Sequence, residues 1–469
     1  MPFWKIAWRN MEQRGLASAL TAFSMALGVA VMIAVIVIYS VAVRQFNQNA
    51  EGYNYIVGGK GGALQLVLST VYHIGQPLYP IPYSYYEKFL PGGEFASFTE
   101  TAIPQCLGDS YQARDDSVFR VVATTPDLFD KIEYGSNKDG TPKKYEFQPG
   151  GRNFKTDAYF EGVIGSVVAS RSGLKVGDSF QPSHGLAGGS DLHHAVKVVG
   201  VLKPTGTADD RALFMNIEGF YLLPGHSLGA KANEESGDSA AGEKQETEAE
   251  KKAREEKEEA EEHAYEEELE KQLAAGTAKP LPAAQREVTS ILLLCKGPVA
   301  AQYLDFKINK GKGRVAQAVA PAREVAVLLN SIVGPIRIVL LVLTVLVVIV
   351  AGISILVSIY NSMTERSHDI AVMRALGASR NAVMGIILVE SILLSLGGGL
   401  IGMLMGHGLI GLASPYVVER TGIGLGLFEF DWQELILIPG LVILASLVGF
   451  LPALSAYRTD VAKSLSGSR

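Results

Sequence analysis

The residues with the clearest metal-binding chemistry lie close together in the sequence: His184, Asp191, His193 and His194. Imidazole nitrogens and carboxylate oxygens are ligands that Zn²⁺ takes in proteins. His193 and His194 are adjacent, however, and in a strand their side chains would point to opposite faces. We therefore predict solvated loop histidines here, with no metal site and no cofactor.

A second chemical feature is a carboxylate beside a long apolar run. Glu390 lies within Gly385–Leu394. An ionisable group at membrane depth is expensive and usually has a partner or water nearby. We read Glu390 as an intramembrane polar residue or as one close to the cytoplasmic interface, and we assign it no ion or proton role.

A third feature is a short polar segment between two apolar runs, in which Ile370, Met373 and Leu376 recur at i, i+3 and i+6. This spacing predicts an amphipathic helix over residues 367–376. Such a helix would either rest on lipid headgroups or dock a cytoplasmic partner. The spacing alone does not separate the two.

The ends of this helix are also marked. Asp369 near its start and Arg374 near its end match the helix dipole. Gly377 suits a left-handed cap, and Ser379 suits the N-cap of a following helix. Neither a Gly-x-x-x-x-Gly-Lys-Ser/Thr phosphate loop nor a His-Glu-x-x-His motif occurs in the chain, so we predict no nucleotide site of its own.

The elements that position these residues include four apolar runs without Asp, Glu, Lys or Arg. Each run can hold the ~20 residues that cross a bilayer. The runs are Gly15–Val43, Ile338–Thr364, Ser391–Val418 and Leu435–Tyr457. They predict transmembrane helices over 15–43, about 338–362, 383–412 and 435–457. Residues 1–14 carry Trp4 and Trp8 at helical spacing and suit a cytoplasmic interfacial helix.

A large domain, residues 44–331, is inserted between the first two spans. Short apolar segments bounded by Gly, Pro, Asp or Asn predict its strands, and two segments predict helices. The predicted strands are Tyr53–Val57, Phe119–Ala123, Gly162–Val168, Ala195–Leu202, Ala212–Asn216 and Ser290–Cys295; the helices are Tyr83–Leu90 and Ala316–Leu329. The fold class is therefore a four-helix membrane protein with a large α+β domain.

A charged insertion over residues 231–285 interrupts this domain. Glu243–Gln272 carries 14 Glu against 6 Lys and Arg, whereas the whole chain has a net charge of −6. The rest of the chain is then about +2, which gives no sign of nucleic-acid binding. The segment has no apolar stripe, so we read it as a solvated helix or as disordered, and not as a functional site.

The orientation follows from the basic residues of the short loops. Nine Lys and Arg lie on one side, against Arg420 on the other. The nine are Lys5, Arg9, Arg14, Arg366, Arg374, Arg380, Arg458, Lys463 and Arg469. Both termini are therefore predicted to be cytoplasmic, and the large domain to be extracytoplasmic.

Two further patterns concern packing. Gly398, Gly402 and Gly406 are four residues apart in the third span, which allows close helix approach within one subunit or between two. Cys106 and Cys295 both fall in the large domain. One interpretation is a disulfide between these two cysteines, although two unrelated buried thiols are the favoured interpretation.

Together these features resemble the FtsX/MacB/LolC-type permeases of ABC transporters. The resemblance covers the C-terminal third best, residues 332–469. Asp369–Arg380 resembles the cytoplasmic loop of that family, with Asp where Glu is usual. Pro452–Leu465 resembles its C-terminal ending, and Trp8-Arg9-Asn10 its N-terminal elbow. The domain after the first span resembles the MacB periplasmic core.

The resemblance implies a permease of the bacterial inner membrane that lacks a fused ATPase. A separate ABC ATPase would drive it by mechanotransmission, and two permease chains, identical or different, would pair among membrane lipids. Asp369, Ile370, Met373, Arg374, Leu376 and Gly377 would then form the coupling helix. Cargo would be extracted or exported at the extracytoplasmic side.

The cargo is left open among a lipoprotein, a lipid-like or other hydrophobic molecule, and a peptide. A periplasmic or outer-membrane partner is also left open. A second interpretation is a membrane regulator that transmits the state of an ATPase to an extracytoplasmic partner, such as a cell-wall hydrolase.

Overall fold

The computed structural model describes residues 3–49, 51–137, 139–185, 193–226, 267–269, 271–273, 275, 277–311, 315–365, 367–421, 430 and 432–458. The chain divides into two compact units. The helical unit comprises Met1–Arg44, Leu329–Val418 and Gly424–Arg469. The inserted domain comprises Gln45–Leu328, together with the short segment Glu419–Ile423.

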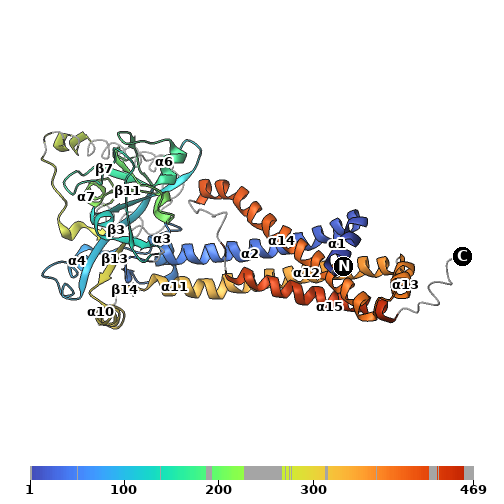
Figure 1. The fold of residues 1–469 in the computed structure, drawn as a ribbon. Coiled ribbons are helices and arrows are strands. Elements are labelled where there is room, and N and C mark those ends of the chain that lie inside the picture. Colours follow the sequence, from blue (N-terminus) through green and yellow to red (C-terminus); the bar gives the residue numbers. More distant parts are fainter. Residues whose placement is uncertain are drawn as a thin grey trace, which may run out of the picture. The chain divides into compact units, whose positions relative to one another are not determined.

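The helical unit contains the four predicted spans (Figure 1). Its helices are α1 (Phe3–Gln13), α2 (Gly15–Asn49), α12 (Gly334–Glu365), α13 (Ser367–Ala375), α14 (Arg380–Thr421) and α15 (Leu437–Arg458), with a π-turn η3 (Leu329–Val333) before α12 and a 3₁₀ turn η4 (Trp432–Ile436) before α15. The fold class predicted from the charge-free runs is thereby confirmed. The helices extend beyond most of the predicted bounds, because the polar residues that flank each run are still helical.

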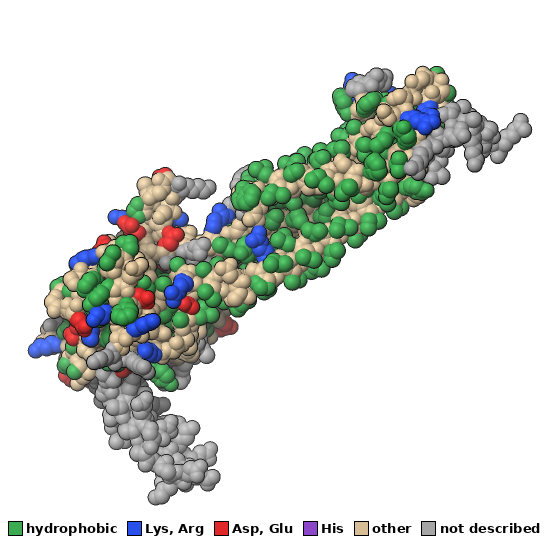
Figure 2. All heavy atoms as spheres, turned by 90° about the horizontal axis from the view of Figure 1, so that it is seen from below, with side chains coloured by type: hydrophobic (Ala, Val, Ile, Leu, Met, Phe, Trp, Pro, Cys, Tyr) green, Lys and Arg blue, Asp and Glu red, His purple; other side chains and the backbone are tan. Residues whose placement is uncertain are grey.

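The four spans differ in how much of their surface the unit covers. In α2 and α14, 44% of the most apolar window is buried, against 22% in α12 and α15. On α12 the side chains of Val342, Leu346 and Val350 lie one turn apart and are more than half exposed. Figure 2 shows the resulting coat of hydrophobic side chains over the helical unit. In a bilayer such a surface faces lipid tails.

The inserted domain is built on a ten-stranded mixed sheet. The strand order is β14-β1-β13-β3-β4-β11-β7-β10-β8, and β9 pairs with β3 off this path. These strands are β1 (Tyr55–Gly59), β3 (Thr99–Gln112), β4 (Val118–Thr124), β7 (Glu161–Ile164), β8 (Ser179–Phe180), β9 (Ser183–His184), β10 (Val196–Val201), β11 (Ala212–Asn216), β13 (Ser290–Cys295) and β14 (Ala316–Val319). Two small sheets pair β2 (Ile81–Pro82) with β12 (Glu287–Val288), and β5 (Glu133–Ser136) with β6 (Pro142–Lys144).

Most neighbouring strands run antiparallel, whereas β11 runs parallel to β4 and β10 runs parallel to β7. Short helices connect and cover the strands. They are α3 (Ala63–Val71), α4 (Tyr83–Glu87), α5 (Asp127–Lys131), α6 (Ser166–Ser172), η1 (Ala208–Arg211), α7 (Ile217–Tyr221), η2 (Ala283–Gln285), α10 (Pro298–Lys310) and α11 (Pro321–Leu328). The mixed α and β content agrees with the predicted class.

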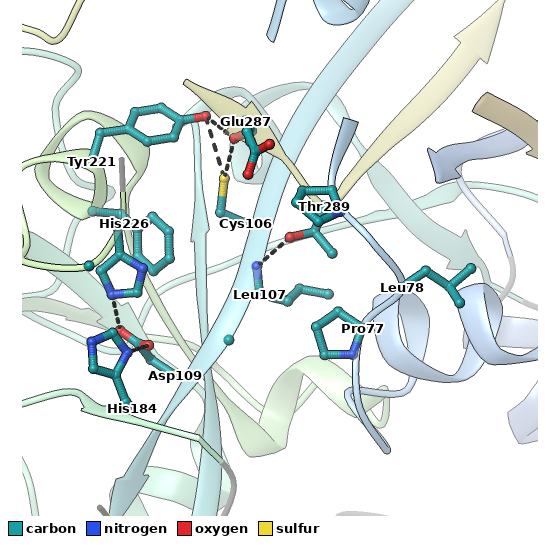
Figure 3. A pocket seen from close by; sticks show the side chains of 14 residues that line it. Pro77, Leu78, Cys106, Leu107, Asp109, His184, Tyr221, His226, Glu287 and Thr289 are labelled. Atoms are coloured by element: carbon teal, nitrogen blue, oxygen red, sulfur yellow. Dashed lines mark hydrogen bonds and ion pairs between the residues drawn. The ribbon is translucent and has the colours of Figure 1, made fainter. Parts of the chain in front are cut away.

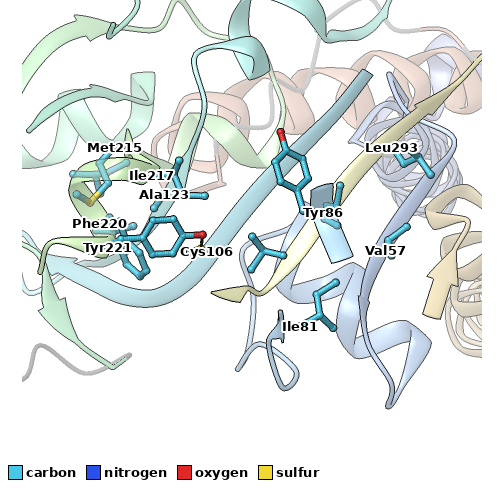
Figure 4. Close-up of a cluster of buried hydrophobic side chains, with 14 of the residues drawn as sticks. Val57, Ile81, Tyr86, Cys106, Ala123, Met215, Ile217, Phe220, Tyr221 and Leu293 are labelled. Atoms are coloured by element: carbon cyan, nitrogen blue, oxygen red, sulfur yellow. Dashed lines mark hydrogen bonds between the residues drawn. The ribbon is translucent and has the colours of Figure 1, made fainter. Parts of the chain in front are cut away.

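The core of the domain joins residues that are far apart in the sequence. Val57, Cys106, Met215 and Leu293 come from four different strands and are buried in one hydrophobic cluster (Figure 4). Cys106 and Cys295 are both buried thiols that are not joined in a disulfide, as the favoured interpretation expected. Cys295 pairs with Thr99 of β3, so seven residues of strand, about 20 Å, separate it from Cys106.

Three sequence predictions need correction, and one strand was missed. The helix predicted over Tyr83–Leu90 ends at Glu87. The segment Gly162–Val168 is strand only to Ile164, because helix α6 begins at Ser166. The helix predicted over Ala316–Leu329 begins with edge strand β14, and its helical part starts at Pro321, whose ring suits the first turn. Strand β3, the longest of the sheet, was not predicted.

The predicted insertion over residues 231–285 lies largely outside the described residues. Its last part is described and packs on the domain. Tyr159 donates a hydrogen bond to the carbonyl oxygen of Ala278, and Leu281 packs against the hydrophobic core. The carbonyl oxygen of Leu281 accepts a 2.6 Å hydrogen bond from Arg286. Residues from 277 onward therefore belong to the folded domain.

Candidate functional site

Helix α13 ends as its sequence requires. Ala378 donates its backbone N–H to the carbonyl oxygen of Met373, and Gly377 donates to that of Arg374, both at 3.0 Å. With Gly377 at φ +101°, this is a Schellman cap. Ser379 then caps α14, because its Oγ accepts from the N–H of Ala382 at 3.2 Å. Only two residues, Ala378 and Ser379, separate the cap of α13 from the first residue of α14.

The predicted apolar face of this helix is not uniform. Ile370 is 5% exposed and Met373 is half-buried, whereas Leu376 is 84% exposed. The side chain of Asp369 lies outside the described part of the chain. Leu376 instead pairs with Val372, one turn earlier and 38% exposed. Helix α13 thus packs inward through Ile370 and presents a small apolar surface through Val372 and Leu376.

The three predicted glycines of α14 face α2 of the same chain. A Cβ added at Gly398, Gly402 or Gly406 would lie 2.7, 2.5 and 3.1 Å from a carbonyl oxygen of α2. The two backbones are therefore in direct contact, as small residues at this spacing permit. These positions are occupied by packing within one chain.

Two pairs of polar side chains connect elements of the helical unit. His407 of α14 lies 3.0 Å from Glu434 of η4, and both are buried. Arg337 donates to Gln433 at 2.7 Å and lies over the ring of Tyr39. Glu390 is 5% exposed. The sequence analysis missed the His407 pair, since Glu434 is 27 residues away and stands outside the fourth apolar run.

The inserted domain contains a cavity of about 370 Å³ between β3, α7 and the segment before α4 (Figure 3). Its apolar wall includes Leu78, Leu107 and Phe220, and its polar wall includes Asp109, His184 and His226. This is the size of a small-molecule site.

Four side chains meet at the polar wall. Asp109 belongs to β3, and His184 belongs to β9 and lies opposite Asp109 in the register. His193 precedes β10, and its N–H donates to the carbonyl oxygen of Pro182. His226 follows α7. Figure 3 shows His184 and His226 pointing at Asp109.

The distances in this cluster are short. One oxygen of Asp109, Oδ2, lies 3.2 Å from Nε2 of His226 and 3.7 Å from Nε2 of His193. The other, Oδ1, lies 3.5 Å from Nδ1 of His184. The Nε2 atoms of His193 and His226 are 3.3 Å apart. Burial alone would raise the pKa of Asp109, but the facing imidazoles, His226 first, hold that pKa below its ordinary value.

The sequence analysis grouped the histidines differently. His193 is 1% exposed, so the expectation of solvated loop histidines is wrong for it. His194 points elsewhere and packs on the ring of Phe160 at 4.3 Å, as expected of adjacent residues with opposed side chains. Asp191 lies outside the described residues. Asp109 and His226 were missed because they are 75 and 42 residues away from His184.

The segment Gly225–Gly229 has the Gly-x-Ser-x-Gly spacing of a hydrolase nucleophile elbow. That elbow requires a strand before the serine. Here the preceding element is helix α7, followed by a turn in which Gly225 adopts φ +75°. The structural context of a nucleophile elbow is therefore not met.

Two family models match different parts of the chain. The FtsX-like permease C-terminal model matches residues 341–461, and the MacB-like periplasmic core domain model matches residues 18–250. The chain belongs to the FtsX- and MacB-like ABC transporter permeases. This confirms the family suggested by the cytoplasmic loop and by the placement of the domain.

The permease is accordingly a multi-pass membrane protein whose inserted domain is extracytoplasmic. Helix α13 and the glycines of α14 lie within the FtsX-like match, and the four residues of the cluster lie within the MacB-like match. Neither matched model is an ATPase domain.

Several relatives of known sequence are also ABC transporter permeases or contain one. An uncharacterized ABC transporter permease of Methanocaldococcus jannaschii is 30% identical over 172 residues, which is 34% of this chain and 40% of the relative. The uncharacterized ABC transporter permease YknZ of Bacillus subtilis is 31% identical over 121 residues, 25% of this chain and 28% of that protein. The macrolide export ATP-binding/permease protein MacB of a Shewanella species is 31% identical over 127 residues, 26% and 18% of the two chains. The permease thus spans less than half the length of these curated relatives.

Among solved structures, the extracellular domain of the noncanonic ABC-type transporter YknZ from Gram-positive bacteria aligns with a TM-score of 0.28 at 10% identity, covering 57% of this chain and 99% of that one.

Proposed function

We propose that this permease is the membrane subunit of an ABC transporter and that it works by mechanotransmission. A separate ATPase binds α13 on the cytoplasmic side. Its ATP-driven closure displaces the helices, and the extracytoplasmic domain rearranges to extract or export a substrate. The observation that carries this proposal is the geometry of α13, a helix whose cap residue, Gly377, is separated by two residues from the first residue of a long span.

The docking surface proposed for the ATPase is the apolar pair Val372 and Leu376, with Arg374 between them. Leu376 is 84% exposed at the end of a rigidly capped helix. A protruding Leu on such a helix can fill a pocket of a partner while its own backbone stays ordered. Ile370, which is buried, holds the helix from the other side.

Displacement of α13 passes to α14 through the short turn at Gly377–Ser379. Helix α14 in turn contacts the backbone of α2 at Gly398, Gly402 and Gly406. Such contacts leave little room for sliding, because at these three positions no side chain of α14 separates the two backbones. Helix α2 continues to Asn49, where the extracytoplasmic domain has begun.

The pairing of polar side chains in the spans supports our proposal that the substrate is handled outside the membrane. Among the described residues, His407 is paired with Glu434 and Arg337 with Gln433. A pathway for a polar solute would need a series of polar groups along the bundle. We therefore propose a hydrophobic or amphipathic cargo, such as a lipid-like molecule, lipoprotein or peptide, taken up at the extracytoplasmic side.

The proposed assembly contains two permease chains and two ATPase subunits, with both termini of the permease in the cytoplasm. The close-contact glycines already pack against α2, so a second chain would use another face of the helices. Every basic residue of α1, and the loop that carries α13, would then be cytoplasmic.

The coupling is tested by Leu376→Glu in the permease reconstituted with its ATPase. A charge on the docking pair should lower the stimulation of ATP hydrolysis by the permease at least tenfold, while membrane insertion stays intact. Val299→Glu is the matched control, because Val299 is 81% exposed on α10 of the domain. Equal ATP turnover for Leu376→Glu and the control would exclude α13 as the docking helix.

The orientation is tested with single introduced cysteines. The two native thiols are buried and should give a low background with a membrane-impermeant maleimide. Tyr79→Cys, at a position 85% exposed in the domain, should react in intact cells. Leu376→Cys should react only after the membrane is opened. The reverse pattern would invert the proposed topology.

A further inference from the structure

The cluster at the cavity has the donor set and the spacing of a metal centre. Each of Asp109, His184, His193 and His226 offers one ligand atom, and these atoms all lie within 4.8 Å of one another. Four donors around Zn²⁺ at 2.0–2.1 Å form a tetrahedron whose edges are about 3.3 Å. Three of these atoms, Oδ2 of Asp109 and the Nε2 atoms of His193 and His226, lie 3.2, 3.3 and 3.7 Å apart, close to such an edge. Nδ1 of His184 lies 3.5 Å from the other carboxylate oxygen, Oδ1.

The fold brings these ligands together from elements that the core holds in place. Asp109 follows a register shift in β3, between Leu107 and Ser110, where the strand bulges. Two-residue strand β9 is fixed opposite it, with His184 against Asp109 and Ser183 against Ser110. Gly225, at φ +75°, lets the chain pass His184 closely, since a Cβ there would lie 3.0 Å from Nε2 of that histidine.

The burial of Asp109 also favours a cation. Its side chain is fully buried, and neither carboxylate oxygen accepts a geometrically complete hydrogen bond from the described residues. A buried carboxylate costs free energy unless a charge or donors compensate it. The nearby Arg120 supplies part of the compensation at a distance, while its own Nη2 donates to the carbonyl oxygen of Gly75. The groups in direct range of Asp109 are the three imidazoles.

We propose that Asp109, His184, His193 and His226 bind one divalent cation of the zinc type. Three imidazoles and one carboxylate suit Zn²⁺ better than Mg²⁺ or Ca²⁺, which prefer sites made of oxygen ligands only. Four protein donors fill a tetrahedral sphere, as in structural zinc sites. The ion would join β3, β9, the start of β10 and the end of α7 at one wall of the cavity. His184, with 43% of its side chain exposed, gives the ion access from solvent.

The first test uses the full-length permease in detergent, stripped with a chelator and passed over a desalting column. Zinc content after loading with ZnCl₂ and desalting should reach one equivalent by elemental analysis. Loading with Co²⁺ instead should give the visible absorption of a tetrahedral ion with nitrogen and oxygen ligands. Absence of bound metal in the unaltered permease overturns the proposal, and so does an octahedral cobalt spectrum.

The second test assigns the ligands. His193→Ala and His226→Ala should each lose at least tenfold in zinc affinity, measured by competition with a chromophoric chelator. His194→Ala is the matched control, because His194 is the neighbour of His193 but packs on Phe160. Unchanged affinity in both ligand variants overturns the proposal and would assign the ion to other groups, such as the acidic insertion.

A third readout separates loss of binding from loss of folding. Zinc should raise the unfolding temperature of the unaltered permease and of His194→Ala, since a ligand that binds only the folded state stabilises it. It should not raise the unfolding temperature of Asp109→Asn, which keeps the shape of the side chain. A hydrogen-bonded imidazolium cluster without metal predicts no zinc effect in any of the three proteins, and that result would also overturn the proposal.

Discussion

The helical unit and the extracytoplasmic domain hold their backbones together in different ways. In the helical unit, two helix backbones make close contact where side chains are missing. Gly402 of α14 touches α2 so closely that a Cβ would lie 2.5 Å from the carbonyl oxygen of Ala26. In the domain, a buried side chain does the same task. Asn216, 1% exposed, donates to three carbonyl oxygens of the loop 155–158 and accepts from the N–H of Glu218.

The difference follows from where each backbone finds its hydrogen bonds. Inside a span, every N–H and C=O is already paired within the helix, so two helices gain most from close approach. In a loop, the backbone groups have no regular partner and need a side chain to supply one. At these two sites, a substitution therefore damages the helical unit by adding atoms, and the domain by removing them.

The largest effect should come from adding atoms to the helical contact. Gly402→Val places a branched side chain against Ala26 and Val29, and overpacking of this kind costs about 1–3 kcal/mol or more. We expect a strong drop in the thermal unfolding temperature in detergent. Gly408→Val is the control on the same helix, because nothing lies within 4 Å of a Cβ at that position. Equal loss in both variants would mean that the contact with α2 is not what matters.

A similar or slightly smaller loss should follow from removing atoms in the domain. Asn216→Ala leaves carbonyl oxygens of the 155–158 loop without their donor and removes the cap of α7, at a cost of about 1–3 kcal/mol. Asn137→Ala, in an exposed turn where the side chain bonds only to Thr141, should change stability by less than about 0.5 kcal/mol. Chemical denaturation followed by far-UV circular dichroism gives the free energy of unfolding of both variants. A neutral Asn216→Ala would contradict the role given to that side chain.

The pair His407–Glu434 joins α14 to η4 through two buried polar side chains. Measured hydrogen bonds between transmembrane helices average well under 1 kcal/mol and reach about 1.7. We expect His407→Ala and Glu434→Gln each to cost about 1 kcal/mol. The double variant should cost less than the sum, by unfolding in detergent. Full additivity would show that the two groups do not interact.

The smallest effect should come from shortening the acidic insertion. Deletion of residues 231–265 should leave the stability of the domain within about 0.5 kcal/mol, because their sequence has no apolar stripe that a core could bury. A deletion extended to residue 285 should cost more, since it removes Leu281 from the core and the carbonyl oxygen that Arg286 binds. Equal stability of the two deletion variants would place the boundary between the insertion and the folded domain elsewhere.

The same contrast explains what the sequence could predict. The spans follow from the length of charge-free runs, and the end of α13 from the order Gly377-Ala378-Ser379, because both depend on neighbouring residues. Strand β3 was missed since Pro104, Gly108 and Asp109 break its apolar pattern, although its neighbours on both sides supply its hydrogen bonds.

The sequence did not predict the cluster at the cavity, for a related reason. Its four residues extend from Asp109 to His226, and only the sheet brings them together. The sequence does show two of the four residues, His184 and His193, close together, but it gives no direct sign of the other two. A carboxylate that interrupts a strand, as Asp109 does next to Gly108, is the clue that could have extended this pair.

Helix length gives the proposed mechanism its reach. At 1.5 Å per residue the 42 residues of α14 measure about 63 Å, roughly twice the hydrocarbon thickness of a bilayer. The 22 residues of α15 measure about 33 Å and barely cross it. A tilt of α14 by about ten degrees around one end would swing the other end through about 10 Å. A lever of this length amplifies a small cytoplasmic rotation into a stroke comparable to the width of a helix.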